Sequence, residues 1–92
     1  MTKSDLVNQI AIATGYDKAT VSVILESTMA TIKKNIAEGE NIYLRGFGSF
    51  INKTRAAKVG RNISRSMTVY VPEHKIPSFK PANDFMSMVR NQ

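Results

Sequence analysis

Apolar positions in the first part of the chain recur with the period of an α-helix. Residues 3–14 carry an apolar stripe, and Gly15 stands where such a helix would end. Asp17 is a suitable N-cap for a second, longer helix over 18–38, which Gly39 terminates. The apolar stripe of this second helix consists of Val21, Leu25, Met29, Ile32 and Ile36. Two amphipathic helices separated by a short turn predict a helical hairpin.

The apolar period changes to two residues in the middle of the chain, which is typical of β-strands. Residues 42–45 alternate, and the glycines of 46–48 supply a turn into a second strand. The β-branched and aromatic run 68–71 predicts another strand, which stops at Pro72. Pro81 suits the first turn of a C-terminal helix. The pattern therefore predicts an α+β fold: an N-terminal helical hairpin, an antiparallel β-sheet with a long protruding two-stranded β-arm, and a short C-terminal helix.

The length allows one domain, with a core that is small for a single chain. The chain has 92 residues and a mass of 10.2 kDa, and we expect a body over 1–52 and 75–92 and an arm over 53–74. The arm carries few large apolar side chains, so about 70 residues remain to build a core worth roughly 3–5 kcal/mol. The large aromatic candidates for that core are Phe47, Phe50, Phe79 and Phe85. An intimate homodimer, in which two chains share one core, resolves this shortage.

Charge is distributed unevenly along the chain. The net charge is +6 and the pI is about 9.9. Residues 1–44 carry −1, residues 45–80 carry +7, and residues 81–92 are neutral. A near-neutral half joined to a strongly basic half predicts a scaffold with a surface for a polyanion.

Composition argues against most catalytic and membrane functions. The chain has no Cys and one His, which excludes a disulfide framework, a thiol nucleophile and a Cys- or His-rich metal site. It has neither a signal-peptide pattern nor an apolar run of about 18 residues. The glycines of 46–48 lack the rest of a phosphate-binding motif, and His74 is interpreted as a surface or dimer-packing residue. We therefore predict no enzyme activity, catalytic residue, cofactor, metal, membrane partner or small-molecule substrate.

The basic segment is the strongest indication of function. Lys53 and Arg55 are two positions apart, so they fall on one face of a strand, and further cations alternate with small residues up to Arg61. Such a ribbon can lie in a nucleic-acid groove with its cations against phosphates. A pair of arms from a dimer would then embrace a duplex.

Three motifs give the chain a family resemblance that covers almost its whole length. They are Arg45-Gly-Phe-Gly-Ser-Phe50, Gly60-Arg-Asn62 and Ile76-Pro-Ser-Phe-Lys-Pro81. In this order and spacing they resemble the HU/IHF family of bacterial nucleoid-associated proteins. The resemblance implies an intertwined α/β dimer whose two β-arms grip the minor groove and bend DNA.

The resemblance also assigns roles by position. It implies arm contacts at Lys53, Arg55, Lys58 and Arg61, and phosphate contacts on the body at Lys3 and Lys80. The family usually has Pro after Gly-Arg-Asn, where this chain has Ile63, a bulky apolar residue that we interpret as a wedge between base steps. The full set of predicted DNA-binding residues is Lys3, Arg45, Lys53, Arg55, Lys58, Arg61, Ile63, Arg65, Lys75 and Lys80.

The predicted function is an architectural homodimer in the cytoplasm, at the nucleoid, that bends and compacts double-stranded DNA. Because the minor groove has a degenerate hydrogen-bond pattern, we expect weak sequence preference and a preference for bent, nicked or junction DNA. Two alternatives remain open: a basic module that prefers RNA, and a protein-interaction dimer whose arm docks an acidic partner.

Overall fold

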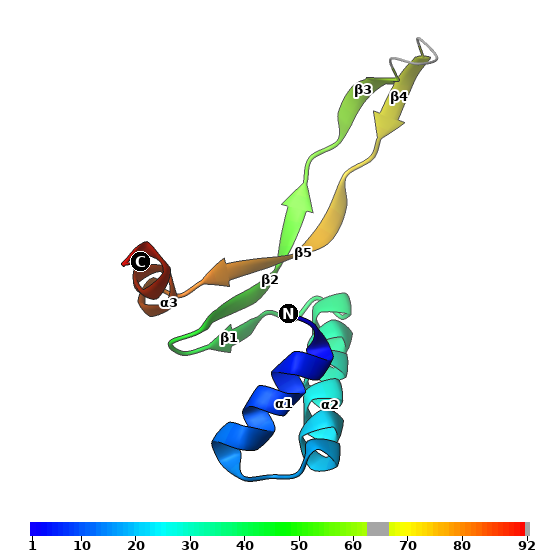
Figure 1. The fold of residues 1–92 in the computed structure, drawn as a ribbon. Helices are drawn as coiled ribbons and strands as arrows, with labels where there is room; N and C mark the ends of the chain where they lie inside the picture. Colours follow the sequence, from blue (N-terminus) through cyan, green and yellow to red (C-terminus); the bar gives the residue numbers. More distant parts are fainter. Residues whose placement is uncertain (63–66, 92) are drawn as a thin grey trace. The chain divides into compact units, whose positions relative to one another are not determined.

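The structure is a computed structural model that describes residues 1–62 and 67–91. The chain divides into two compact units, residues 1–34 and 35–92, which are described separately. Its elements along the chain are α1 (Lys3–Thr14), α2 (Lys18–Ala37), β1 (Ile42–Leu44), β2 (Gly48–Arg55), β3 (Lys58–Asn62), β4 (Met67–Val71), β5 (His74–Pro81) and α3 (Asn83–Arg90) (Figure 1).

Both ends of α1 are fixed by local chemistry. Thr2 and Asp5 form a capping box, in which the Asp5 carboxylate accepts the backbone N–H of Thr2 at 2.9 Å and the Thr2 hydroxyl accepts that of Asp5. The N–H of Thr2 lowers the pKa of the Asp5 carboxyl below its ordinary value. Gly15 ends the helix at φ 81°, a left-handed conformation that favours glycine. The predicted helix over 3–14 is confirmed.

The second helix starts at the predicted cap. The Asp17 carboxylate accepts the backbone N–H of Thr20 at 2.7 Å, and this bond lowers the pKa of Asp17. The predicted stripe is the more covered side of the helix, with Val21 at 4% and Ile36 at 8% exposure. The helix ends at Ala37, one residue before the predicted end, and Gly39 follows with φ 91°.

The larger sheet has the order β1-β2-β5 and is antiparallel throughout. The turn between β1 and β2 is closed by a bond from the N–H of Phe47 to the carbonyl of Leu44 at 3.0 Å, with Gly46 at φ 80°. β5 pairs with β2 over its whole length, from His74 opposite Arg55 to Pro81 opposite Gly48.

The predicted placement of Pro81 in the C-terminal helix is wrong, because Pro81 pairs with Gly48 as part of a strand. Pro81 is the last residue of β5, and α3 begins at Asn83 with Ala82 as its N-cap. The fixed φ of proline also suits extended backbone, and β5 lies at the sheet edge, where a missing N–H is tolerated. The same reason admits Pro77 within β5, a strand that the sequence pattern did not predict.

An aromatic cluster forms on one face of this sheet. The ring of Phe79 lies 4.9 Å from Phe50 and 5.2 Å from Phe47 between centroids, and Phe47 stacks on Phe85 of α3 at 5.5 Å. These four residues are the predicted aromatic set. Phe47 nevertheless remains 46% exposed and Phe79 37% exposed.

The outer part of the arm is a two-stranded ribbon beyond β2 and β5. β3 pairs with β4 in a separate antiparallel register, from Lys58 opposite Val71 to Asn62 opposite Met67. Both strands of the ribbon break at the same level, at Ala56-Ala57 on one strand and at Pro72-Glu73 on the other. Figure 1 shows the ribbon continuing from β2 and β5 into β3 and β4.

Few apolar side chains are buried within one chain. Among the described residues, the buried apolar side chains are Val7, Val21 and Ile36. Large apolar groups such as Leu44, Val89 and Met88 are 40%, 58% and 73% exposed. Within the described part of the chain, no helix has the length and apolar character that crossing a membrane requires.

Candidate nucleic-acid interface

Cations gather on the face of the sheet opposite the aromatic cluster. Successive residues of a strand point to opposite faces, and directly paired residues share a face. Because Lys53 pairs with Ile76 and Ser49 pairs with Lys80, these residues share a face with Arg55, while Phe50 and Phe79 lie on the other. The polar face, as we call it, comprises Tyr43, Ser49, Ile51, Lys53, Arg55, His74, Ile76, Ser78 and Lys80.

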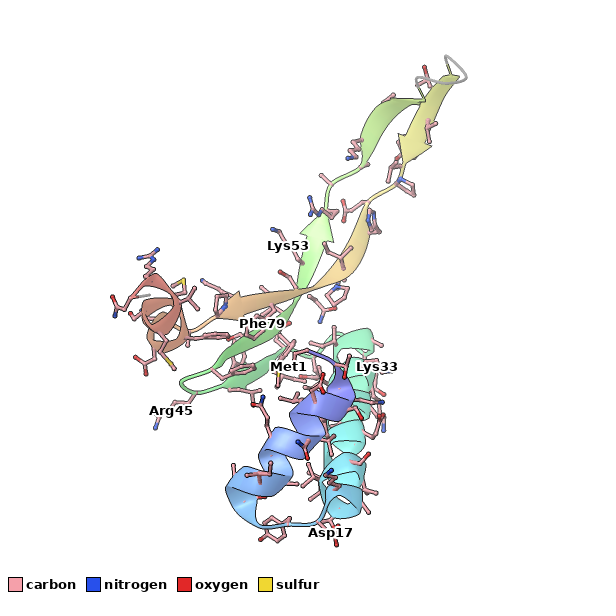
Figure 2. The ribbon with its side chains drawn as sticks, viewed as in Figure 1. Met1, Asp17, Lys33, Arg45, Lys53 and Phe79 are labelled. Atoms are coloured by element: carbon pink, nitrogen blue, oxygen red, sulfur yellow. The ribbon has the colours of Figure 1, made fainter. Side chains whose placement is uncertain are left out.

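The charged groups of this face are exposed to solvent. Lys53, Arg55 and Lys80 are all exposed, whereas Ser49 and Ile51 between them are half-buried. Figure 2 shows Lys53 projecting from β2. The sheet thus brings together three of the predicted DNA-binding residues on one of its faces.

Lys75 lies on the other face of the same sheet. It pairs with Thr54, so it shares a face with Phe50 and Phe79 rather than with Lys53. It lines a pocket of about 350 Å³ together with residues 36–39, at the C-terminal end of α2. The carbonyl end of a helix carries partial negative charge, which favours a nearby cation such as Lys75.

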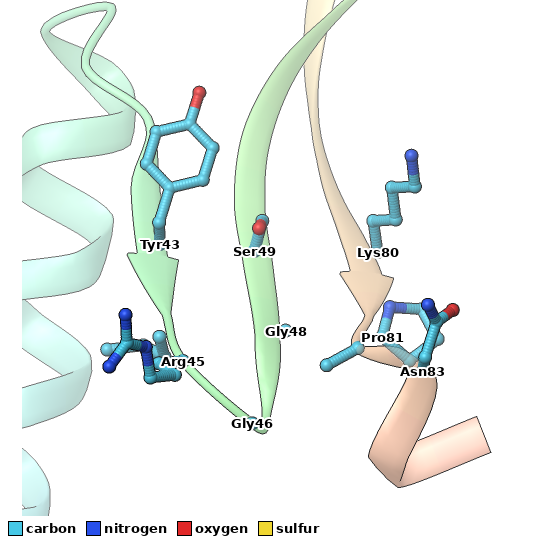
Figure 3. A pocket seen from close by; sticks show the side chains of 10 residues that line it. Tyr43, Arg45, Gly46, Gly48, Ser49, Lys80, Pro81 and Asn83 are labelled. Atoms are coloured by element: carbon cyan, nitrogen blue, oxygen red, sulfur yellow. The ribbon is translucent and has the colours of Figure 1, made fainter. Parts of the chain in front are cut away.

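A pocket of about 380 Å³ adjoins the polar face on the body (Figure 3). Arg45 and Lys80 supply its cations, Ser49 supplies a hydroxyl, and Asn83 supplies an amide. In Figure 3, Arg45 lies at the end of β1, and Lys80 lies on β5, with β2 between the two strands. The full lining is Tyr43, Leu44, Arg45, Gly46, Gly48, Ser49, Lys80, Pro81, Ala82 and Asn83.

The N-terminus of α3 forms one wall of this pocket. Ala82 is the N-cap, no side chain caps this end, and the Ala82 N–H bonds to the Phe47 carbonyl at 2.9 Å. An uncapped helix N-terminus carries partial positive charge, which Asp84 in the first turn offsets in part. With Arg45 and Lys80 beside it, the pocket is suited to an oxyanion such as a phosphate.

The arm presents both charge and apolar surface. Lys58 is exposed at the start of β3. Val59 and Tyr70 pair directly and are 67% and 66% exposed, so they form an apolar patch on one face of the arm. Arg61 lies in β3 opposite Thr68, and its side chain is outside the described part of the structure.

The predicted tip contacts Ile63 and Arg65 lie outside the described residues.

Lys3, at the start of α1, forms an ion pair with Glu26 of α2. Its ammonium group is thus engaged within the helical unit, although its side chain is half-exposed.

Sequence reasoning missed several groups of the candidate interface. Ser49 and Asn83 are 34 positions apart in the sequence, and only the sheet register brings them to one pocket. Tyr70 could have been found, because an exposed aromatic residue in a strand that pairs with the basic strand β3 is a candidate for a groove contact. His74 is on the polar face because of its register with Arg55, which spacing alone does not reveal.

Comparison with known proteins is decisive for the family. The model of the bacterial DNA-binding protein family matches residues 1–90. The chain belongs to this family, the HU/IHF family. It is 36% identical over 90 residues to DNA-binding protein HU of Thermotoga maritima, covering 98% of this chain and 100% of that protein. It is 35% identical over 80 residues to DNA-binding protein HU-beta of Escherichia coli K12, covering 87% and 89% of the two chains.

The HU fold is also found among solved structures. A cocrystal structure of Anabaena HU with DNA has a TM-score of 0.94 to this chain, at 28% identity and full coverage of both chains. The predicted α+β architecture of the HU/IHF family is confirmed, and so is the predicted class, an architectural DNA-binding protein.

Proposed function

We propose that two copies of this chain form a dimer that holds double-stranded DNA between its arms and bends it at the nucleoid. The observation that carries this proposal is the two-stranded arm with exposed Lys58 and no core of its own. A ribbon of this kind is stabilised by a partner surface, and a positively charged ribbon fits a polyanionic groove.

The arm is better suited to contacts in the minor groove than to reading the base sequence. The apolar pair Val59 and Tyr70 packs against sugars, while Lys58 and Arg61 neutralise flanking phosphates. Contacts of this kind respond to groove width and to the energy of deforming DNA. The chain therefore binds with weak sequence preference and prefers DNA that is already bent, nicked or branched.

The body supplies a second set of phosphate contacts. The polar face and the body pocket share Tyr43, Ser49 and Lys80. DNA that follows the polar face from Arg55 and Lys53 towards the body then meets Lys80 and the N-terminus of α3. This continuity is the reason for assigning Arg45 and Lys80 to phosphates, whereas Lys75, on the opposite face, contributes mainly long-range charge.

The dimer follows from the incomplete core. The aromatic cluster and α3 leave Phe47, Phe79 and Val89 substantially exposed, and burying apolar surface is worth about 25 cal/mol per Å². A second copy covers these groups, because a chain of 92 residues gains little stability from the few side chains buried here. Residues 1–92 act as one DNA-binding domain, with a body over 1–52 and 75–92 and an arm over 53–74.

The tip assignments belong to the same proposal. Ile63 acts as the apolar wedge between base steps, with Arg61 and Arg65 on the neighbouring phosphates. Binding and bending, with no catalytic step, are the whole activity. Neither of the alternatives, a preference for RNA or an acidic protein partner, has a specific observation in its favour.

A gel-shift competition tests this function. Linear, nicked and four-way-junction DNA compete with duplex RNA of equal length at about 0.1 M salt. We expect junction and nicked DNA to bind more tightly than linear DNA, and RNA to compete weakly. The double variant K53A/R55A should lose affinity, while the matched variant K33A/K34A, which removes equal charge from α2, should not. Equal competition by RNA, or the absence of any shift, would contradict the proposal.

A further inference from the structure

His74 occupies a position that the proposed contacts leave unused. It is the first residue of β5, it is exposed, and it pairs with Arg55 of β2. Paired residues of antiparallel strands have Cβ atoms roughly 5 Å apart on one face. The imidazole therefore belongs to the polar face, beside Arg55 and diagonal to Lys53.

One ring nitrogen of His74 already has a partner. Its Nδ1 atom lies 2.9 Å from the carbonyl oxygen of Pro72. A carbonyl only accepts hydrogen bonds, so Nδ1 carries the proton and donates it. The neutral ring then leaves Nε2 as the basic atom, and a proton added there makes a second donor without disturbing the bond to Pro72.

The charged groups around His74 are predominantly positive. Arg55 faces it from β2, with Lys53 two residues further along that strand. On its own strand Lys75 points to the opposite face, and Glu73 lies in the break between β4 and β5. Among the described residues neither His74 nor Glu73 forms an ion pair. A protonated His74 would thus face Arg55 without a neutralising carboxylate, and like charges in directly opposite positions repel.

A phosphate group relieves this repulsion by accepting from both side chains. We propose that His74 is a proton-dependent phosphate ligand at the base of the arm, which binds the DNA backbone through Nε2–H next to Arg55. This inference rests on the proposed function and adds a regulation to it: each protomer holds the DNA backbone by one further hydrogen bond as the pH falls. Histidine is the side chain that gains a charge between about pH 8 and pH 5.

Binding to one short duplex at about pH 5.5 and about pH 8 tests the proposal, with the same series of salt concentrations at each pH and with intact dimeric protein. In the wild type the slope of log K against log salt should steepen by roughly 0.9 for each His74 bound to a phosphate at the lower pH, which at about 0.1 M salt is a roughly eightfold increase in affinity per histidine. H74Q should show neither change, and H74K should bind tightly at both pH values. A pH dependence that H74Q retains would overturn the proposal.

Proton uptake gives a second and independent readout. Calorimetry near pH 6.5, in two buffers of different ionisation heat, counts the protons taken up when DNA binds. The wild type should take up protons, and H74Q should take up fewer, by as much as one per protomer. Equal uptake by both proteins would contradict the role of His74. Loss of all DNA binding by the wild type at pH 8 would instead contradict the proposed function itself, so the two failures are distinguishable.

Discussion

Gly48 and Phe79 approach each other so closely that no side chain fits between them. A Cβ atom on Gly48 would lie 2.6 Å from Cζ of the Phe79 ring and 2.6 Å from the backbone carbonyl oxygen of Lys80. The ring cannot easily yield, because it also packs against Phe50 and Phe47. The glycine at the start of β2 is therefore a packing requirement of the aromatic cluster.

Replacing Gly48 with Ala should destabilise the fold. Overpacking by one methyl group in such a site costs about 1–3 kcal/mol in free energy of unfolding, measured by denaturant titration. Gly60→Ala is the matched control, because the nearest atom to its added Cβ, the carbonyl oxygen of Val69, is 3.9 Å away. Equal losses from the two substitutions would show that close packing at Gly48 is not the cause.

The chain should be a dimer whose stability depends on concentration. Phe47, Phe79 and Val89 are exposed in a single chain, and we expect a second copy to cover them. Sedimentation at low micromolar concentration should give about twice 10.2 kDa, and the melting temperature should rise with protein concentration. A folded monomer with a concentration-independent melting temperature would contradict the shared core.

Arg55 should contribute to binding through phosphate neutralisation. Arg55→Ala removes one cation of the polar face per protomer, so the slope of log K against log salt should become shallower by about 0.9 for each phosphate that is no longer neutralised. Sequence preference should not change, because a side chain bound to a phosphate reads no bases. Lys18→Ala, at the start of α2, is the control and should leave the slope unchanged. Equal effects of the two substitutions would contradict the assignment of the polar face.

Acid should weaken the N-terminal cap of α2. The Thr20 N–H lowers the pKa of Asp17 in the folded state, so the folded protein binds this proton less readily than the unfolded chain. The contribution is present above the ordinary aspartate pKa of about 3.9 and is lost as the pH falls through the lowered value. Asp17→Asn keeps a capping group that does not titrate. Thermal unfolding from neutral to acidic pH should show a smaller loss for the variant, and parallel curves would refute the linkage.

Local patterns explain why the helices and the first strands were predictable from sequence. The stripe from Val21 to Ile36, the capping residue Asp17 and the left-handed Gly15 each act through neighbours in the sequence. The basic arm was predictable for a similar reason, because Lys53 and Arg55 share a strand face at spacing two.

Features that depend on pairing between distant residues were not predictable in this way. Proline is unfavourable inside a strand, and β5 accommodates Pro77 and Pro81 because it is an edge strand of the sheet, next to β2. The body pocket needs the β1–β2 turn and the N-terminus of α3 at one place, and no local motif encodes that meeting. Lys75 and Lys53 looked alike in the sequence, yet the register puts them on opposite faces.

Ile63 should affect DNA bending more than affinity. An apolar side chain inserted between base steps costs a few kcal/mol of unstacking and permits a bend that brings more cationic surface onto the duplex. Ile63→Ala removes the wedge but none of the arm's charges. Most of the affinity for linear DNA should therefore remain, while the bend should diminish and the preference for nicked DNA should change with it.

Energy transfer between dyes at the two ends of a short duplex tests the central claim most directly, which is that the arms hold and bend DNA. At saturating protein the wild type should raise the transfer efficiency well above that of free DNA, and Ile63→Ala at equal occupancy should raise it much less. A wild-type protein that saturates the duplex and leaves the energy transfer at the value of free DNA would contradict the account.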